Sequence, residues 1–211
     1  MTVMTARFMK SDKFAKIESI KELREYGLPV PETVFIFNFA KQEKEIDKFL
    51  RGKKFVSVRS DKAGSTDYCP HMLRCPHSKA KGFIKTVIEG GCAAVLQKYT
   101  PLKKGEIVSG NILALENRIL VELMGVGPLV WLTRKGEVAE QVIFDKKSLK
   151  ETGHFGKRLI SSSKLAKIAR YALPLAPYRV LEFTLRTDGL CFWQIKDDPT
   201  AKRLDNGSKS I

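Results

Sequence analysis

The stretch Val180–Lys196, VLEFTLRTDGLCFWQIK, has the composition of two β-strands joined by a tight turn. Threonine, phenylalanine and tryptophan favour a sheet, and Asp188-Gly189 is typical of a chain reversal. Three polar side chains stand among the apolar residues, namely Glu182, Gln194 and Lys196. They face either solvent on an outer sheet or a bound ligand, and the pairing of the two strands decides whether they share a face.

The length of the turn sets this pairing. A two-residue turn at Asp188-Gly189 would pair Glu182 with Ile195 and would put Gln194 on the opposite face. A three-residue turn at Thr187–Gly189, with its glycine left-handed, pairs Glu182 with Gln194. The longer turn would put on one face the oxygen donors that Mg²⁺ shares with the phosphates of a nucleotide. The alternative is an outer sheet face with scattered polar residues.

The composition of the 211-residue chain is that of a globular protein, since 43% of the residues are hydrophobic. No apolar run is long enough to span a bilayer, and the N-terminal residues lack the apolar segment of a signal peptide, so we expect a cytoplasmic protein. Lysine and arginine number 38 against 23 acidic residues, a net charge of +15. Such a charge attracts nucleotides, nucleic acid or other polyanions, or it serves solubility alone.

Hydrophobic periodicity and turn residues divide the chain into helices and strands. Helices are expected from Phe14 to a stop at Gly27, at Lys41–Leu50, across Ala80–Ile88 and at Lys164–Leu173, the last beginning after a serine cap in residues 161–163. Strands are expected at Thr33–Phe37, Phe55–Arg59, Ala94–Tyr99, Ile107–Leu115, Arg118–Met124, Leu129–Thr133 and Val138–Phe144. The last helix is expected to pack on the apolar face of the closing hairpin, with Phe183, Leu185 and Trp193. The tail after Pro199 is polar and is expected to fray.

This order of elements predicts an α+β fold with antiparallel sheets in two lobes, residues 1–95 and residues 96–211. The sequence has no GxxxxGK[ST] phosphate loop, no GxGxxG and no GxSxG. A nucleotide would therefore be bound without these devices.

Four segments, in order along the chain, resemble the N-terminal nucleotide-binding domain of phosphoenolpyruvate synthase and pyruvate phosphate dikinase, in the ATP-grasp superfamily. They are KIESIKELREYGLPVPETVFI from Lys16, VSVRSDKAGSTD from Val56, AAVLQKYT from Ala93, and the hairpin VLEF…FWQIK. The second resembles the family's "VAVRSSATAED", and the hairpin resembles its closing "IEW…LQAR". The resemblance implies a two-lobed fold with a nucleotide cleft between the lobes, and it implies ATP binding more than pyruvate chemistry.

The resemblance also implies roles for single residues. Phosphate contacts fall on Lys16, Arg59, Ser60 and Lys196; adenine contacts on Gln97, Lys98 and Tyr99; and Mg²⁺ ligation on Glu182 and Gln194. A metal shared by Glu182 and Gln194 requires the three-residue turn, which we therefore expect. The chain departs from the family pattern before Lys16, where Phe14-Ala15 replaces a glycine pair. It departs again after the VRS segment, where YCPHMLRCPH replaces a loop of small residues.

This departing segment holds Cys-Pro-His twice, so Cys69, His71, Cys75 and His77 offer four ligands for a tetrahedral Zn²⁺. The spacing is not a common finger spacing, and each proline stiffens the backbone between two ligands. A lid loop with reduced thiols is one alternative, and a phosphorylated histidine is another. In each case we expect a loop near the nucleotide phosphates, because the segment closely follows Arg59.

The function expected from these residues is that of an ATP- and Mg²⁺-binding protein, a phosphotransferase or an ATP-dependent activating enzyme. No general base can be named. The first alternative is a basic, non-catalytic nucleic-acid-binding protein on a degenerate ATP-grasp scaffold. The second is a zinc-stabilised interaction module.

Overall fold

A computed structural model describes residues 14–65, 70–101, 106–125 and 138–205, and the chain divides into two compact units. The first unit comprises residues 1–18 and 32–100, and the second comprises residues 19–31 and 101–211. The predicted boundary after residue 95 therefore falls inside a strand of the first unit. The first turn of the first helix, α1 (Ala15–Glu25), belongs to the first unit, and the rest of this helix belongs to the second.

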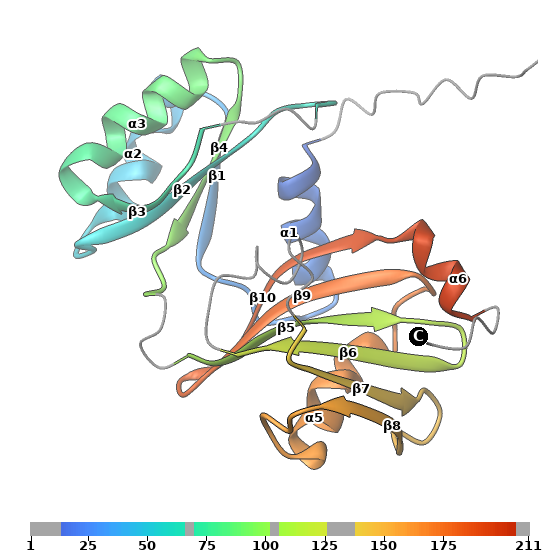
Figure 1. The fold of residues 1–211 in the computed structure, drawn as a ribbon. Helices are drawn as coiled ribbons and strands as arrows, with labels where there is room; N and C mark the ends of the chain where they lie inside the picture. Colours follow the sequence, from blue (N-terminus) through green and yellow to red (C-terminus); the bar gives the residue numbers. More distant parts are fainter. Residues whose placement is uncertain (1–13, 66–69, 102–105, 126–137, 206–211) are drawn as a thin grey trace, which may run out of the picture. The chain divides into compact units, whose positions relative to one another are not determined.

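The first unit is a four-stranded antiparallel sheet with two helices on one face (Figure 1). Its elements are β1 (Thr33–Ile36), α2 (Phe39–Leu50), β2 (Phe55–Asp61), β3 (Met72–Pro76), α3 (His77–Glu89) and β4 (Ala93–Lys98), and the strand order is β1-β4-β2-β3. In β2, Val56 and Val58 are fully buried against the helices, whereas Ser57 and Arg59 point to the other face. The predicted alternation along this strand is confirmed.

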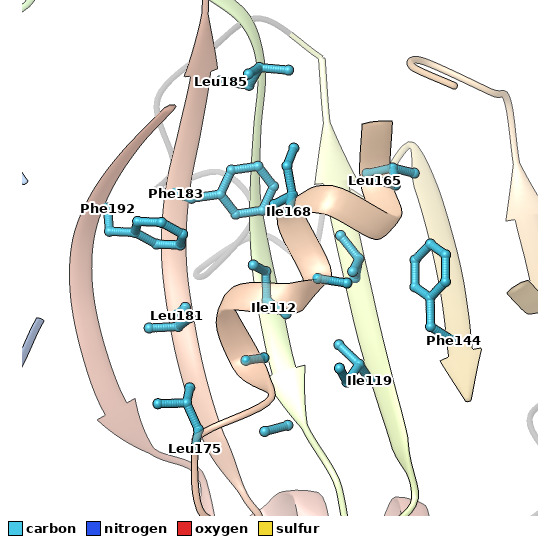
Figure 2. Packing of buried hydrophobic residues seen from close by; sticks show 14 of the residues in the cluster. Ile112, Ile119, Phe144, Leu165, Ile168, Leu175, Leu181, Phe183, Leu185 and Phe192 are labelled. Carbon is cyan, nitrogen blue, oxygen red and sulfur yellow. The ribbon is translucent and has the colours of Figure 1, made fainter. Parts of the chain in front are cut away.

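The second unit is a six-stranded antiparallel sheet, in the order β10-β9-β5-β6-β7-β8. Its strands are β5 (Glu106–Ala114), β6 (Arg118–Met124), β7 (Glu140–Asp145), β8 (Glu151–Gly156), β9 (Arg179–Arg186) and β10 (Gly189–Asp197). Its helices are α5 (Ser162–Ala169), η1 (Arg170–Ala172), η2 (Pro199–Ala201) and α6 (Lys202–Asp205). Figure 2 shows Leu165 and Ile168 of α5 at the apolar face of the sheet, with Ile168 beside Phe183.

Most expected elements are present, and the exceptions are informative. Ser161 caps α5 with its side chain, as predicted. Strand β8 was not expected, and residues 199–205 form η2 and α6 where a frayed tail was expected; the rest of the tail lies outside the described residues. The expected strand at Leu129–Thr133 lies outside the described residues. No helix in the described parts of the chain is long and apolar enough to cross a membrane.

Candidate functional site

Glu182 and Gln194 are cross-strand partners in the closing hairpin, as predicted, but the predicted turn is wrong. Gly189 pairs with Arg186, so the loop has two residues, Thr187 and Asp188. If regular pairing continued from this turn along both strands, Glu182 would pair with Trp193. A register shift between Phe192 and Gln194 inserts Trp193 as an extra residue and moves the pairing by one position. The expected polar face therefore forms through a β-bulge and not through a longer turn.

Lys196 follows on the same face. Its Nζ donates a hydrogen bond to Glu182 Oε1 at 2.7 Å, and the Glu182 side chain is only 14% exposed. The ammonium is thus the electrostatic partner of a largely buried carboxylate. A bound cation at Glu182 has to share this carboxylate with Lys196 or displace it.

Because of the bulge, the side chain of Trp193 does not lie on the apolar face where it is predicted from the sequence. Phe183 and Leu185 are buried in the core against α5, as predicted. Trp193 instead donates its indole Nε1 hydrogen to Thr184 Oγ1 at 2.8 Å, and this hydroxyl also lies 2.8 Å from Ser109 Oγ. Because Thr184 alternates with the two core residues along β9, the indole lies on the polar face.

The polar face continues across the sheet as one row of side chains. Glu182 pairs with Asn111 of β5, Asn111 with Glu122 of β6, and Glu122 with Gln141 of β7. Together with Gln194 of β10 they form the polar row: Gln194, Glu182, Asn111, Glu122 and Gln141. Gln141 Nε2 donates to Glu122 Oε1 at 3.2 Å, and burial raises the pKa of the Glu122 carboxyl. Of these five residues, only Gln194 and Glu182 are predicted from the sequence.

The donor set at the β10 end of the polar row fits Mg²⁺. A carboxylate and a carboxamide from neighbouring strands offer oxygen atoms, which this ion prefers. Asn111 lies beside them, and its Oδ1 is buried with no hydrogen-bond partner among the described residues. An acceptor in this state is what a bound cation, or a donor from a ligand, would satisfy.

In the first unit, Lys16 lies at the start of α1. Its Nζ donates to the Ser60 carbonyl at 2.7 Å. The backbone N–H groups of Lys16 and Ile17 donate to Asp61 Oδ2 at 2.8 and 2.9 Å, so Asp61 at the end of β2 satisfies two donors of the first helical turn. Asp61 is buried and was missed by the sequence analysis, since it lies about 45 residues from its partners.

Ser60 was expected to contact phosphate, but in this structure its hydroxyl is already used. Ser60 is 1% exposed, and its Oγ donates to the Pro70 carbonyl. Arg59, one residue earlier, lies on the face opposite the buried valines, as expected.

The three residues expected near adenine differ in exposure. Gln97 is buried, and its Nε2 donates to Thr33 Oγ1 at 3.1 Å, so its side chain holds β4 to β1. Lys98 is exposed. Tyr99 packs edge-on against Phe55, with 5.9 Å between the ring centroids.

The expectation of a loop through the Cys-Pro-His repeats is wrong for residues 72–77. Met72–Pro76 is strand β3, and His77 begins α3. Cys75 is fully buried in the core of the first unit, where burial raises the pKa of its thiol. His77 Nδ1 lies 3.1 Å from the Lys53 carbonyl oxygen.

The expected zinc set is therefore not assembled, because Cys75 cannot join a shared Zn²⁺ without leaving the core. Cys69 lies outside the described residues. Among the residues that the structure describes, no group of three or more histidine, cysteine, aspartate or glutamate side chains is placed to hold a metal ion.

Comparison with solved structures identifies the fold. The chain is similar to a RimK domain ATP-grasp protein from Sphaerobacter thermophilus, with 14% identity and a TM-score of 0.51 over 92% of this chain and 63% of the other. It is similar to the D-alanyl-alanine synthetase A of Vibrio cholerae, with 12% identity and a TM-score of 0.53 over 95% of this chain and 61% of the other. It thus spans less than two thirds of either relative.

A third similar structure is ACD1 of Candidatus Korarchaeum cryptofilum in complex with coenzyme A, with 12% identity and a TM-score of 0.54. The match covers 85% of this chain and 89% of that one. No family model and no curated protein matches the sequence. At these identities the comparisons show the fold, and the chemistry rests on the residues described above.

Proposed function

The chain has the ATP-grasp fold, and on that premise we propose that it binds ATP with Mg²⁺ and uses the nucleotide to activate a substrate. The observation that carries the proposal is the pairing of Glu182 with Gln194. The β-bulge brings a largely buried carboxylate and a carboxamide to one face of the sheet. Such a pair gives Mg²⁺ two protein oxygens and leaves its other positions for phosphate oxygens and water.

Cations for the phosphates are available in each unit. In the second unit, Lys196 already holds its ammonium at Glu182. In the first unit, the Lys16 ammonium donates to the Ser60 carbonyl near the end of β2, and Arg59 lies on the face of this strand opposite the buried valines. We propose that these three side chains neutralise phosphate charge, with Arg59 able to form two parallel hydrogen bonds.

The reaction proposed is phosphoryl transfer from ATP, as a phosphotransferase or as an enzyme that activates its substrate by phosphorylation. What a bound Mg²⁺ supplies is charge neutralisation at the phosphate oxygens. The protein side chains hold the phosphates in place and stabilise charge as the transferred group leaves. Catalysis of this kind needs positioned cations more than it needs a general base.

A screen of thermal unfolding against nucleotides tests this proposal. A ligand that binds only the folded protein raises its melting temperature. ATP with Mg²⁺ is expected to raise it more than ATP with a chelator does. No shift with any nucleoside triphosphate at millimolar concentration would contradict the proposal.

A second candidate function is the binding of single-stranded nucleic acid by the first unit. The Arg74 guanidinium lies 4.3 Å from the ring centroid of Phe55, and the Lys54 ammonium lies 5.7 Å from it. Tyr99 makes an edge-on ring contact with Phe55. Aromatic and basic side chains combined in this way stack bases and track phosphates. Binding of an oligonucleotide that weakens steeply with salt, and that Phe55→Ala reduces, would favour this candidate.

A further inference from the structure

Asn111 is the member of the polar row whose side-chain oxygen is buried without a hydrogen-bond partner among the described residues. It lies in β5, in the middle of the six-stranded sheet, and its cross-strand partners are Glu182 on one side and Glu122 on the other. Directly opposed residues on antiparallel strands share a face, with Cβ atoms about 5 Å apart. The carboxamide is therefore held between two carboxyl groups.

The NH₂ group and the oxygen of this carboxamide need different hydrogen-bonding partners. Its NH₂ group can donate to either neighbouring carboxylate. Its Oδ1 needs a donor or a cation; an ionised Glu182 is neither, and Glu122, whose pKa burial raises, donates only in its protonated form. In the described part of the chain, Oδ1 is buried and has no hydrogen-bond partner. The ammonium of Lys196 is engaged with Glu182.

We propose that Asn111 is a third oxygen ligand of the metal site, acting with Glu182 and Gln194. The inference rests on the proposed function, since it assumes that a divalent cation binds at Glu182. The three residues come from adjacent strands in the order β10, β9 and β5, so Glu182 has a residue with a carboxamide side chain on each side. A central carboxylate flanked by two neutral oxygens provides the hard donors that Mg²⁺ and Mn²⁺ select.

The position of Asn111 is also fixed more firmly than that of a surface side chain. Its strand is hydrogen-bonded on both sides, to β9 and to β6. The preceding Gly110 lies so close to β6 that an added Cβ would collide with the Glu122 carbonyl oxygen. A ligand carried by such a strand needs little ordering when the ion binds.

Titration with Mn²⁺, followed by electron paramagnetic resonance without nucleotide, tests the assignment. Asn111→Ala is expected to weaken Mn²⁺ binding by about tenfold, in the range found for lost metal-site partners. Asn111→Asp keeps an oxygen and adds charge, so it is expected to bind Mn²⁺ at least as tightly as the unchanged protein. Asn117→Ala and Asn117→Asp, at an exposed position in the β5–β6 turn, are the matched controls and should leave the affinity unchanged.

The possible outcomes separate this inference from the proposed function. If Glu182→Gln abolishes Mn²⁺ binding and Asn111→Ala does not change it, Asn111 is only a structural amide and the inference fails alone. If the unchanged protein binds no Mn²⁺, with or without ATP, the proposed function and the inference fail together. If Asn111→Ala does not fold, Asn111→Asp decides, because affinity lower than that of the unchanged protein overturns the assignment.

Discussion

Glu182 of β9 faces Gln194 of β10 because Trp193 is inserted between two stretches of regular pairing. The turn at Thr187-Asp188 alone would have placed the tryptophan opposite the glutamate. The bulge thus puts the carboxamide beside the carboxylate, and its extra residue donates a hydrogen bond to Thr184 on the same face. One irregularity accounts both for the proposed ligand pair and for the tryptophan beside it.

Replacing Lys196 with methionine is expected to tighten Mn²⁺ binding in the absence of nucleotide, by about threefold to tenfold. The reason is that the ammonium 2.7 Å from Glu182 Oε1 competes with the ion for this carboxylate. The same substitution is expected to weaken ATP binding, because it removes a cation proposed for the phosphates. Lys167→Met, on the exposed side of α5, removes the same charge and serves as the control. Weaker Mn²⁺ binding by Lys196→Met would argue against the competition.

Asp61→Ala is expected to lower the free energy of unfolding by about 1–3 kcal/mol, because two backbone donors of α1 lose their buried acceptor. Asp61→Asn keeps an acceptor oxygen and should cost less. Denaturant unfolding measures both. Glu89→Ala breaks only an exposed pair with Lys85 and should change stability by less than about 0.5 kcal/mol. Equal effects of Asp61→Ala and Glu89→Ala would show that the cap contributes nothing.

The sequence predicts those features that depend on neighbours along the chain. Alternation identified β2 and the burial of Val56 and Val58, and the serine cap located the start of α5. Strand β8 was missed because ETGHFG is poor in β-branched residues; it is an edge strand, held by pairing with β7. Strand β3 was missed because its cysteine–proline pattern is typical of a loop, although proline is tolerated on an edge strand.

The candidate site was predictable in part for the same reason. The hairpin carries Glu182, Gln194 and Lys196 within one short segment, so their shared face was predictable, although it forms through a bulge and not through the longer turn. Asn111 and Asp61 act on residues far away in the sequence. Their roles follow from the register of several strands and from the contact between α1 and β2, which local patterns do not encode.

Gly110→Ala is expected to destabilise the protein by more than about 1 kcal/mol, since overpacking in a core forces the backbone to shift. The added Cβ would collide with the Glu122 carbonyl oxygen and lie 2.8 Å from Leu123 Cδ2. Gly82→Ala is the control: this glycine lies in α3 with no heavy atom within 4 Å of an added Cβ. The control should stabilise by about 0.5–1 kcal/mol through helix propensity. Thermal unfolding of both variants checks the contrast, which would disappear if β5 and β6 were further apart.

Cys191 is expected to resist alkylation in the folded protein. Burial raises the pKa of its thiol to about 12. At about pH 8 the reactive thiolate is then roughly a thousandfold scarcer than for an ordinary cysteine, and labelling should be slower in proportion. Mass spectrometry of the peptide containing Cys191, after iodoacetamide treatment of native and unfolded protein, measures the ratio. Similar labelling of both forms would refute the raised pKa of this partly buried thiol.

Calorimetric titration of the protein with ATP, in the presence and in the absence of Mg²⁺, tests the central claim most directly. The unchanged protein is expected to bind ATP more tightly with Mg²⁺. Glu182→Gln is expected to weaken the Mg²⁺-dependent binding by about tenfold or more and to leave binding without metal nearly unchanged. No ATP binding at millimolar concentration, or an equal loss with and without Mg²⁺ in Glu182→Gln, would contradict the claim that this face holds the metal of a bound nucleotide.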